Sequence, residues 1–154
     1  MSRLEVGAKA PRFTLRDHRG DTVSSTSLIG QRFVLYFYPE DDTPGCTVEA
    51  CGFRDEWSAL SELGVPVLGV SPDDAASHAA FREKYALPFN LLSDPTKETM
   101  AAYGAYGEKV LYGKKVVGVI RSTFVVGPTG LIEHAWYGPR TAGHAQRVRA
   151  ALEA

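Results

Sequence analysis

The 154-residue sequence predicts an α/β fold in which a mixed central sheet is flanked by helices. Apolar, β-favouring stretches alternate with amphipathic stretches along most of the chain, which is typical of this class. The last two β-favouring stretches are joined by a short turn, so part of the sheet is expected to be antiparallel. No internal repeat, low-complexity tract or long linker divides the sequence, and its length suits one core. We therefore expect residues 1–154 to form a single domain.

The first third of the chain is expected to contain a small hairpin, a buried strand and a helix. Residues 13–16 and 22–23 are short β-favouring runs separated by a Gly-containing turn, which predicts an N-terminal β-hairpin. The apolar run Phe-Val-Leu-Tyr-Phe-Tyr at 33–38 predicts a central strand. From residue 47, apolar side chains recur at three- and four-residue steps, which indicates a helix that ends at Gly64.

Two further strands are each followed by a helix. Residues 65–71 form a second apolar run, and Ser-Pro-Asp-Asp at 71–74 is a helix start with acidic residues in its first turn. The helix is expected to continue to Tyr85. Residues 87–95 then predict a short strand, and residues 96–103 a short helix.

The C-terminal part predicts an antiparallel hairpin and a last helix. Residues 118–126 and 131–136 are β-favouring, and Gly-Pro-Thr-Gly at 127–130 joins them as a turn. Residues 143–152 predict the final helix. This order of elements fits a mixed sheet with helices on both faces, the class to which thioredoxin-like domains belong.

Composition and charge exclude several classes of function. A net charge of −1 gives no basic excess for binding phosphates, so we expect no nucleic-acid partner. The sequence begins without the apolar core of a signal peptide and has no uninterrupted apolar run of about 18 residues, so we expect a cytoplasmic protein that does not cross a membrane. A structural disulfide does not persist in that compartment, so a close cysteine pair there is more often catalytic, redox-sensing or metal-binding.

The two cysteines of the chain, Cys46 and Cys51, lie five residues apart where the predicted strand at 33–38 gives way to a helix. The thiolate is the nucleophilic form of cysteine, and it needs stabilisation. Unpaired N–H groups and the dipole of the first helical turn provide part of it.

Nearby carboxylates would oppose this stabilisation if they faced the sulfur. There are four of them close in sequence: Glu40, Asp41, Asp42 and Glu49. A cation is therefore expected from elsewhere, and Arg121 is the best candidate. It lies within a predicted strand among apolar residues, where an unpaired guanidinium would be costly.

Three blocks of sequence carry a resemblance to a known family. The pattern Pro39-x-x-x-Thr43-x-x-Cys46 resembles the active site of peroxiredoxins, and Arg121-Ser-Thr-Phe is similar to the strand that carries their active-site arginine. Residues 47–55 are more closely similar to the bacterioferritin comigratory protein or peroxiredoxin Q subfamily. Further similar blocks occur in the expected order at 6–15, 70–73, 87–94 and 112–115.

The resemblance implies a thioredoxin-like fold and a thiol-dependent peroxidase. Cys46 would be the peroxidatic cysteine, which attacks a hydroperoxide and becomes a sulfenic acid. Thr43, Arg121 and nearby backbone N–H groups would hold the peroxide, and Pro39 would shape the loop and shield the sulfenate. Thioredoxin or a similar dithiol protein would regenerate the enzyme, which is expected to be a monomer, with a weak dimer as the alternative. We expect no cofactor and no metal.

Cys51 is expected to be the resolving cysteine, which forms an intramolecular disulfide with Cys46. In an ideal helix, residues five apart have Cα atoms about 8.6 Å apart. A disulfide usually needs less than about 7 Å, so the first turns of the helix must unwind during each catalytic cycle. Glu49 has two readings: an acid favoured by the helix dipole, or a partner that orients Arg121.

Two other functions remain open at this stage. A disulfide oxidoreductase is a second enzyme hypothesis, although the spacing is Cys-x-x-x-x-Cys and not Cys-x-x-Cys. A peroxide-responsive redox sensor or chaperone-like binding protein would use the cysteine pair as a switch. A zinc site is not expected, because the four histidines are scattered and form no ligand spacing with the cysteines.

Overall fold

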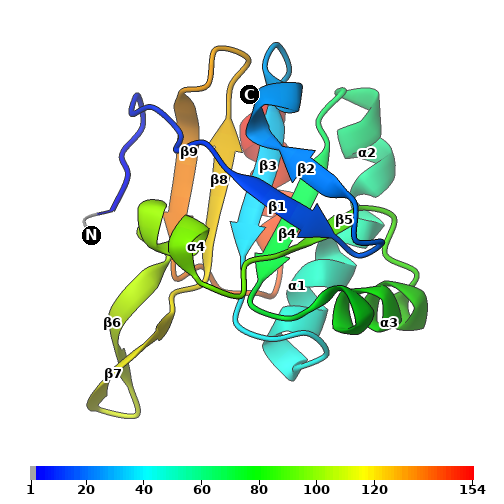
Figure 1. Cartoon of the computed structure of the whole chain (residues 1–154). Coiled ribbons are helices and arrows are strands. Elements are labelled where there is room, and N and C mark those ends of the chain that lie inside the picture. The colour runs from blue at the N-terminus through cyan, green and yellow to red at the C-terminus, as the bar shows by residue number, and fades with distance from the viewer. Residues whose placement is uncertain (1–2) are drawn as a thin grey trace.

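The computed structural model describes residues 3–154 and has a seven-stranded mixed sheet at its centre (Figure 1). Across the sheet the strands are β2 (Thr22–Ser24), β1 (Thr14–Asp17), β5 (Asn90–Ser93), β4 (Val67–Ser71), β3 (Phe33–Phe37), β8 (Ser122–Val126) and β9 (Ile132–Tyr137). The three central strands β5, β4 and β3 are parallel, and the outer pairings are antiparallel. The predicted fold class is therefore confirmed.

Helices cover both faces of the sheet. They are α1 (Pro44–Asp55), α2 (Trp57–Glu62), α3 (Ala75–Tyr85), α4 (Glu98–Ala102) and α5 (His144–Glu153), with a short 3₁₀ helix η1 (Ser25–Leu28) after β2. Among residues 3–154, no helix is long and apolar enough to cross a membrane.

The alternation of side chains along β3 divides the core into two clusters. Val34 and Tyr36 pack with α1, α2, α3 and α5 on one face, while Leu35 and Phe37 pack with α4 on the other. Every residue of β3 is buried, which explains why the strand reads as a continuous apolar run. Cys46, in α1, belongs to the first cluster.

Gly69 of β4 shows how closely this core is packed. A Cβ atom added at Gly69 would lie 2.8 Å from Cζ of Tyr36 and 2.9 Å from a methyl of Leu91. The phenol ring of Tyr36 thus lies over the backbone of the neighbouring strand, and only glycine leaves room for it.

Three sequence expectations need correction. The helix predicted from residue 47 to Gly64 is interrupted at Glu56, which separates α1 from α2, although Gly64 does end the second piece with a φ of +70°. The strand predicted at 118–126 is broken, so Arg121 lies immediately before β8 and not in the middle of a strand. A separate hairpin, β6 (Tyr106–Leu111) and β7 (Lys114–Val119), was not expected and projects from the body of the protein (Figure 1).

Candidate active site

Cys46 lies in the first turn of α1, where the chain leaves the carboxyl end of β3. Thr43 is the N-cap in extended conformation, and Pro44 occupies the first helical position, where its fixed φ suits a helix start. The first helical hydrogen bond runs from the N–H of Thr47 to the carbonyl of Thr43, at 2.8 Å. Cys46 is only 1% exposed, so its sulfur lies at the edge of the core with first-turn N–H groups beside it.

Arg121 supplies the cation that the sequence required. Its Nη2 donates to Sγ of Cys46 at 3.3 Å. The strand register explains this placement, because Ser122 of β8 pairs with Phe37 of β3, which leaves Arg121 beside the segment that leads into α1. Gly45 contributes by lacking a side chain, since a Cβ there would lie 3.3 Å from the same guanidinium nitrogen.

Glu49 lies three residues after Cys46 and therefore on the same side of α1. Nη1 of Arg121 donates to its Oε1 at 2.6 Å. The second reading of Glu49, as the partner that orients Arg121, thus agrees with the structure. Its other oxygen, Oε2, is buried and has no hydrogen-bond partner among residues 3–154.

Burial and pairing act on both members of this ion pair. Burial raises the pKa of Glu49 to about 7, although Arg121 opposes the shift. Burial would lower the pKa of Arg121, but Glu49 and Cys46 outweigh it and raise the pKa above its usual value. Arg121 therefore stays charged, and Glu49 is the group that titrates near neutral pH.

The carboxylates that could have opposed a thiolate are directed to other partners. Asp42 accepts hydrogen bonds from Nζ of Lys84 and from the hydroxyl of Tyr85, both at 2.7 Å. Asp41 contacts Nδ1 of His78 at 2.7 Å. With Glu49 paired to Arg121, Glu40 is the remaining carboxylate of the four, and its side chain is exposed. Asp41, Asp42 and Glu49 thus each have a partner other than the sulfur of Cys46.

Thr43 and Pro39 lie on the loop before α1. The hydroxyl of Thr43 donates to the carbonyl of Glu40 at 2.9 Å and makes no capping bond to the helix, so its oxygen can still accept a hydrogen bond. Pro39 is exposed in the bend that follows β3. The shielding role of Pro39 stays a prediction.

Cys51 lies in the same uninterrupted helix as Cys46, and both are free thiols. It is partly exposed, whereas Cys46 is buried. Because residues five apart in an ideal helix have Cα atoms about 8.6 Å apart, a disulfide between them requires a different conformation of α1.

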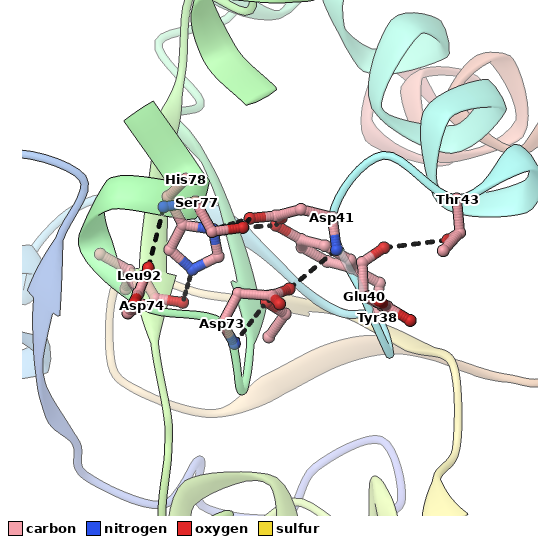
Figure 2. A network of polar contacts seen from close by, with 10 residues as sticks. Tyr38, Glu40, Asp41, Thr43, Asp73, Asp74, Ser77, His78 and Leu92 are labelled. Atoms are coloured by element: carbon pink, nitrogen blue, oxygen red, sulfur yellow. Dashed lines mark hydrogen bonds and ion pairs between the residues drawn. The ribbon is translucent and has the colours of Figure 1, made fainter. Parts of the chain in front are cut away.

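Sequence reasoning missed a second polar cluster close to the first. Asp41, Asp73 and His78 offer ligand atoms within 4.8 Å of one another, which is close enough for a metal ion. These atoms are, however, engaged in hydrogen bonds with the hydroxyls of Tyr38, Ser71 and Ser77 and with the backbone. Figure 2 shows how Asp41, Asp73, Ser77 and His78 face one another. We therefore describe them as a hydrogen-bond network. A histidine on a helix gives no sequence signal for such a cluster, because its partners come from other elements.

Two hollows lie away from this site. One, of about 270 Å³, is lined by residues that include Arg12, Phe33 and Tyr103, and the other, of about 470 Å³, by residues that include Arg32 and Glu133. Neither includes Cys46 or Arg121 in its lining.

The fold and the site together define a thioredoxin-like α/β protein with a buried free cysteine in the first turn of a helix. The model of the AhpC/TSA family matches residues 6–135. The chain belongs to this family of peroxiredoxins and, within it, to the bacterioferritin comigratory protein or peroxiredoxin Q type.

Individual relatives cover nearly the whole chain. The putative peroxiredoxin bcp of Coxiella burnetii is 48% identical over 94% of this chain and 96% of its own. Peroxiredoxin Bcp of Escherichia coli is 42% identical over 94% of this chain and 92% of its own. Among solved structures, peroxiredoxin Q of Xanthomonas campestris has a TM-score of 0.86 at 38% identity over 92% and 89% of the two chains. A mutant of Xylella fastidiosa PrxQ has a TM-score of 0.91 at 32% identity and covers 99% of this chain and 98% of its own. The protein is thus an enzyme of the thiol peroxidase class.

Proposed function

We propose that the protein reduces hydrogen peroxide and organic hydroperoxides with Cys46 as the peroxidatic cysteine. The contact of 3.3 Å between Nη2 of Arg121 and Sγ of Cys46 is the observation that supports this most. It places a permanent cation on the sulfur, where both a thiolate and a departing oxyanion need stabilisation. A solved structure of the Xanthomonas campestris relative is described in terms of alkyl peroxide reduction activity, which supports organic hydroperoxides as substrates.

In the first step the thiolate of Cys46 attacks one oxygen of the hydroperoxide. An S–O bond forms, the O–O bond breaks, and the second oxygen leaves as an alcohol or water after taking up a proton. Cys46 becomes a sulfenic acid and the peroxide is reduced. Arg121 and the N–H groups of Gly45 and Cys46 stabilise the oxygen atoms, and the hydroxyl of Thr43 accepts the hydrogen bond of the peroxide.

In the second step Cys51 resolves the sulfenic acid. Its thiolate attacks the sulfur of Cys46, an S–S bond forms, the S–O bond breaks, and the oxygen leaves as water after taking up a proton. The first turns of α1 unwind to allow this, and the weak helix formers Pro44, Gly45 and Gly52 lower the cost. Thioredoxin or a similar dithiol protein then reduces the disulfide. We further propose that the enzyme is a cytoplasmic, single-domain monomer, since its free cysteine pair needs a reducing compartment.

Rapid mixing of the reduced protein with hydrogen peroxide tests the first step. The wild type should be oxidised at a second-order rate far above that of a free thiolate, and Cys46→Ser should consume no peroxide. Peroxide turnover retained by Cys46→Ser would refute the assignment. A wild-type rate no greater than that of a free low-pKa thiol would instead favour a redox sensor or binding protein.

Mass spectrometry of the oxidised protein tests the second step. Cys51→Ser should keep the first oxidation and stop at the sulfenic acid or its overoxidised forms, without the loss of two hydrogens that marks an intrachain disulfide. The wild type treated in parallel should show that loss.

A further inference from the structure

We propose that Asp41 is a positioning residue that holds the segment before Cys46 in its folded conformation and thereby sets the balance between peroxide attack and unwinding. This inference rests on the proposed function, because it concerns the two conformations that attack and resolution require. Asp41 lies five residues before Cys46, on the loop that joins β3 to α1.

The carboxylate of Asp41 is almost completely enclosed, with a side-chain exposure of 3%. The hydroxyl of Tyr38 donates to its Oδ1 at 2.5 Å, and the hydroxyl of Ser77 donates to its Oδ2 at 2.7 Å. The backbone N–H of Asp41 donates to Oδ2 of Asp73 at 2.8 Å. The loop is thus tied to its own strand and, through Asp73 and Ser77, to the start of α3, as Figure 2 shows.

His78 completes the enclosure of the Asp41 carboxylate. Its Nε2 lies 3.0 Å from the carbonyl of Leu92, which can only accept, so Nε2 carries a hydrogen. Its Nδ1 lies 2.7 Å from Oδ2 of Asp41, so one more proton is shared between these two atoms. Because Oδ1 and Oδ2 of Asp41 also accept hydrogen bonds from the hydroxyls of Tyr38 and Ser77, both carboxylate oxygens are engaged. Both side chains are buried, and removing one partner would leave the other unpaired.

The next residue of the loop makes a contrasting contact. Asp42 has a φ of +56° and binds Nζ of Lys84 at 2.7 Å near the end of α3. The side chains of Lys84 and Asp42 are 57% and 40% exposed, and such solvent-accessible pairs contribute little. The loop therefore has one enclosed anchor, at Asp41, and one exposed contact, at Asp42.

The position of the anchor gives it a role in the catalytic cycle. Thr43 and the first turn of α1 follow Asp41 directly, so a fixed Asp41 holds Thr43 and the N–H groups of Gly45 and Cys46 in place. The bridge between Cys46 and Cys51 requires the segment that begins here to leave that arrangement. A ligand contact or an anchor that favours one of two conformations shifts their populations accordingly. The Asp41 network favours the conformation that attacks peroxide.

Two rate constants measured on the same variants test this proposal. One is the second-order rate of oxidation of the reduced protein by hydrogen peroxide, and the other is the first-order rate of disulfide formation that follows. In Asp41→Ala we expect oxidation to be about tenfold slower and disulfide formation to be several-fold faster. Asp41→Asn, which still accepts from Tyr38 and can donate to a neutral His78, should give intermediate values.

Lys84→Gln is the matched control, since it removes one of the two exposed contacts that Asp42, in the same loop, makes with the same helix. Both of its rates should stay within twofold of the wild type. If Asp41→Ala does not fold, Ser77→Ala is the alternative variant, because it removes a single donor to the carboxylate. It should slow oxidation and accelerate disulfide formation, each by about threefold.

Opposite changes distinguish positioning from general destabilisation. If Asp41→Ala lowers the melting temperature but leaves both rates within twofold of the wild type, or slows both, the proposal is wrong. Failure of the proposed function would look different, because the wild type itself would then not be oxidised rapidly by peroxide or would form no disulfide.

Discussion

The polar clusters around Cys46 and around Asp41 differ in how completely their groups are paired. Around Cys46, Oε2 of Glu49 is buried without a partner among residues 3–154, and the hydroxyl oxygen of Thr43 remains able to accept. Around Asp41, both carboxylate oxygens and the backbone N–H are engaged. Buried polar groups are normally satisfied, so the complete pairing around Asp41 indicates a segment that the fold holds in place, whereas the oxygen of Thr43 can still accept a hydrogen bond from a substrate.

This difference predicts two kinds of mutational effect. Substitutions around Cys46 should change the rate with peroxide more than the stability, and substitutions around Asp41 should act mainly on stability and on the balance of conformations.

The largest effect is expected for Arg121→Gln. It removes the cation that contacts Sγ of Cys46 and leaves Glu49 buried without its partner. The second-order rate of oxidation by hydrogen peroxide should fall roughly 10²- to 10³-fold, as for loss of one donor to a developing oxyanion. Rapid mixing measures this, with Arg32→Gln as the control because Arg32 also pairs with a glutamate, Glu133, away from the site. A fall of less than about fivefold would show that Arg121 does not stabilise the reacting groups.

Tyr38→Phe should act on the cluster around Asp41. It deletes the hydroxyl that donates to Oδ1 of Asp41 and leaves a buried carboxylate oxygen with one donor fewer. The free energy of unfolding should fall by about 1–3 kcal/mol, and the rate with peroxide should fall by about threefold, as for Ser77→Ala. Denaturant unfolding provides the measurement. Tyr85→Phe is the matched control, since the hydroxyl of Tyr85 binds the exposed carboxylate of Asp42. Equal losses of stability in the two variants would contradict the contrast between enclosed and exposed anchors.

Thr43→Val tests a smaller contribution at the cysteine site. The substitution keeps the shape of the side chain but removes the hydroxyl, whose oxygen is available to a peroxide. A loss of about 1–1.5 kcal/mol of transition-state stabilisation corresponds to a rate roughly tenfold lower. Thr22→Val, on the exposed strand β2, should leave the rate unchanged. Unaltered kinetics in Thr43→Val would leave Thr43 only the role of N-cap residue.

Much of the cysteine site could be predicted because its parts lie in strong local patterns. The apolar run before Cys46 and the helical periodicity after it indicated a strand-to-helix junction, and Arg121 among apolar residues indicated a partly buried cation in need of partners. The hairpin of β6 and β7 was missed because its side chains are largely exposed and give no core-facing alternation. The break at Glu56 was missed because apolar spacing continues across it.

The Asp41 network could not be predicted, because it depends on tertiary register. Tyr38 and Asp41 come from the loop that follows β3, His78 comes from the first turn of α3, and the carbonyl of Leu92 comes from β5. No spacing in the sequence brings these elements together. For the same reason the sequence could not show which partners Asp41, Asp42 and Glu49 have in the structure.

Glu49→Gln examines the most finely balanced group of the cysteine site, and its effect should be the smallest. The pKa of Glu49 is raised by burial from 4.5 to about 7 in the folded protein. The folded state therefore binds this proton more tightly than the unfolded state, and the stabilisation is complete below pH 4.5 and lost as pH rises through about 7. Relative to Glu49→Gln, which does not titrate, the wild type should lose stability on the order of 1 kcal/mol between about pH 5 and pH 8.

Denaturant unfolding of the wild type and Glu49→Gln at both pH values measures this difference, with Glu133→Gln as the control for loss of a glutamate paired with arginine. The amide introduced by Glu49→Gln cannot replace the charge that faces Arg121, but its oxygen can still accept from Nη1 at the position of Oε1. The orientation of Arg121 should therefore survive, and the rate with peroxide at about pH 6 should stay within about threefold of the wild type. A pH dependence that is the same in both proteins would mean that Glu49 remains ionised throughout, so that the ion pair with Arg121 outweighs the cost of burying the carboxylate.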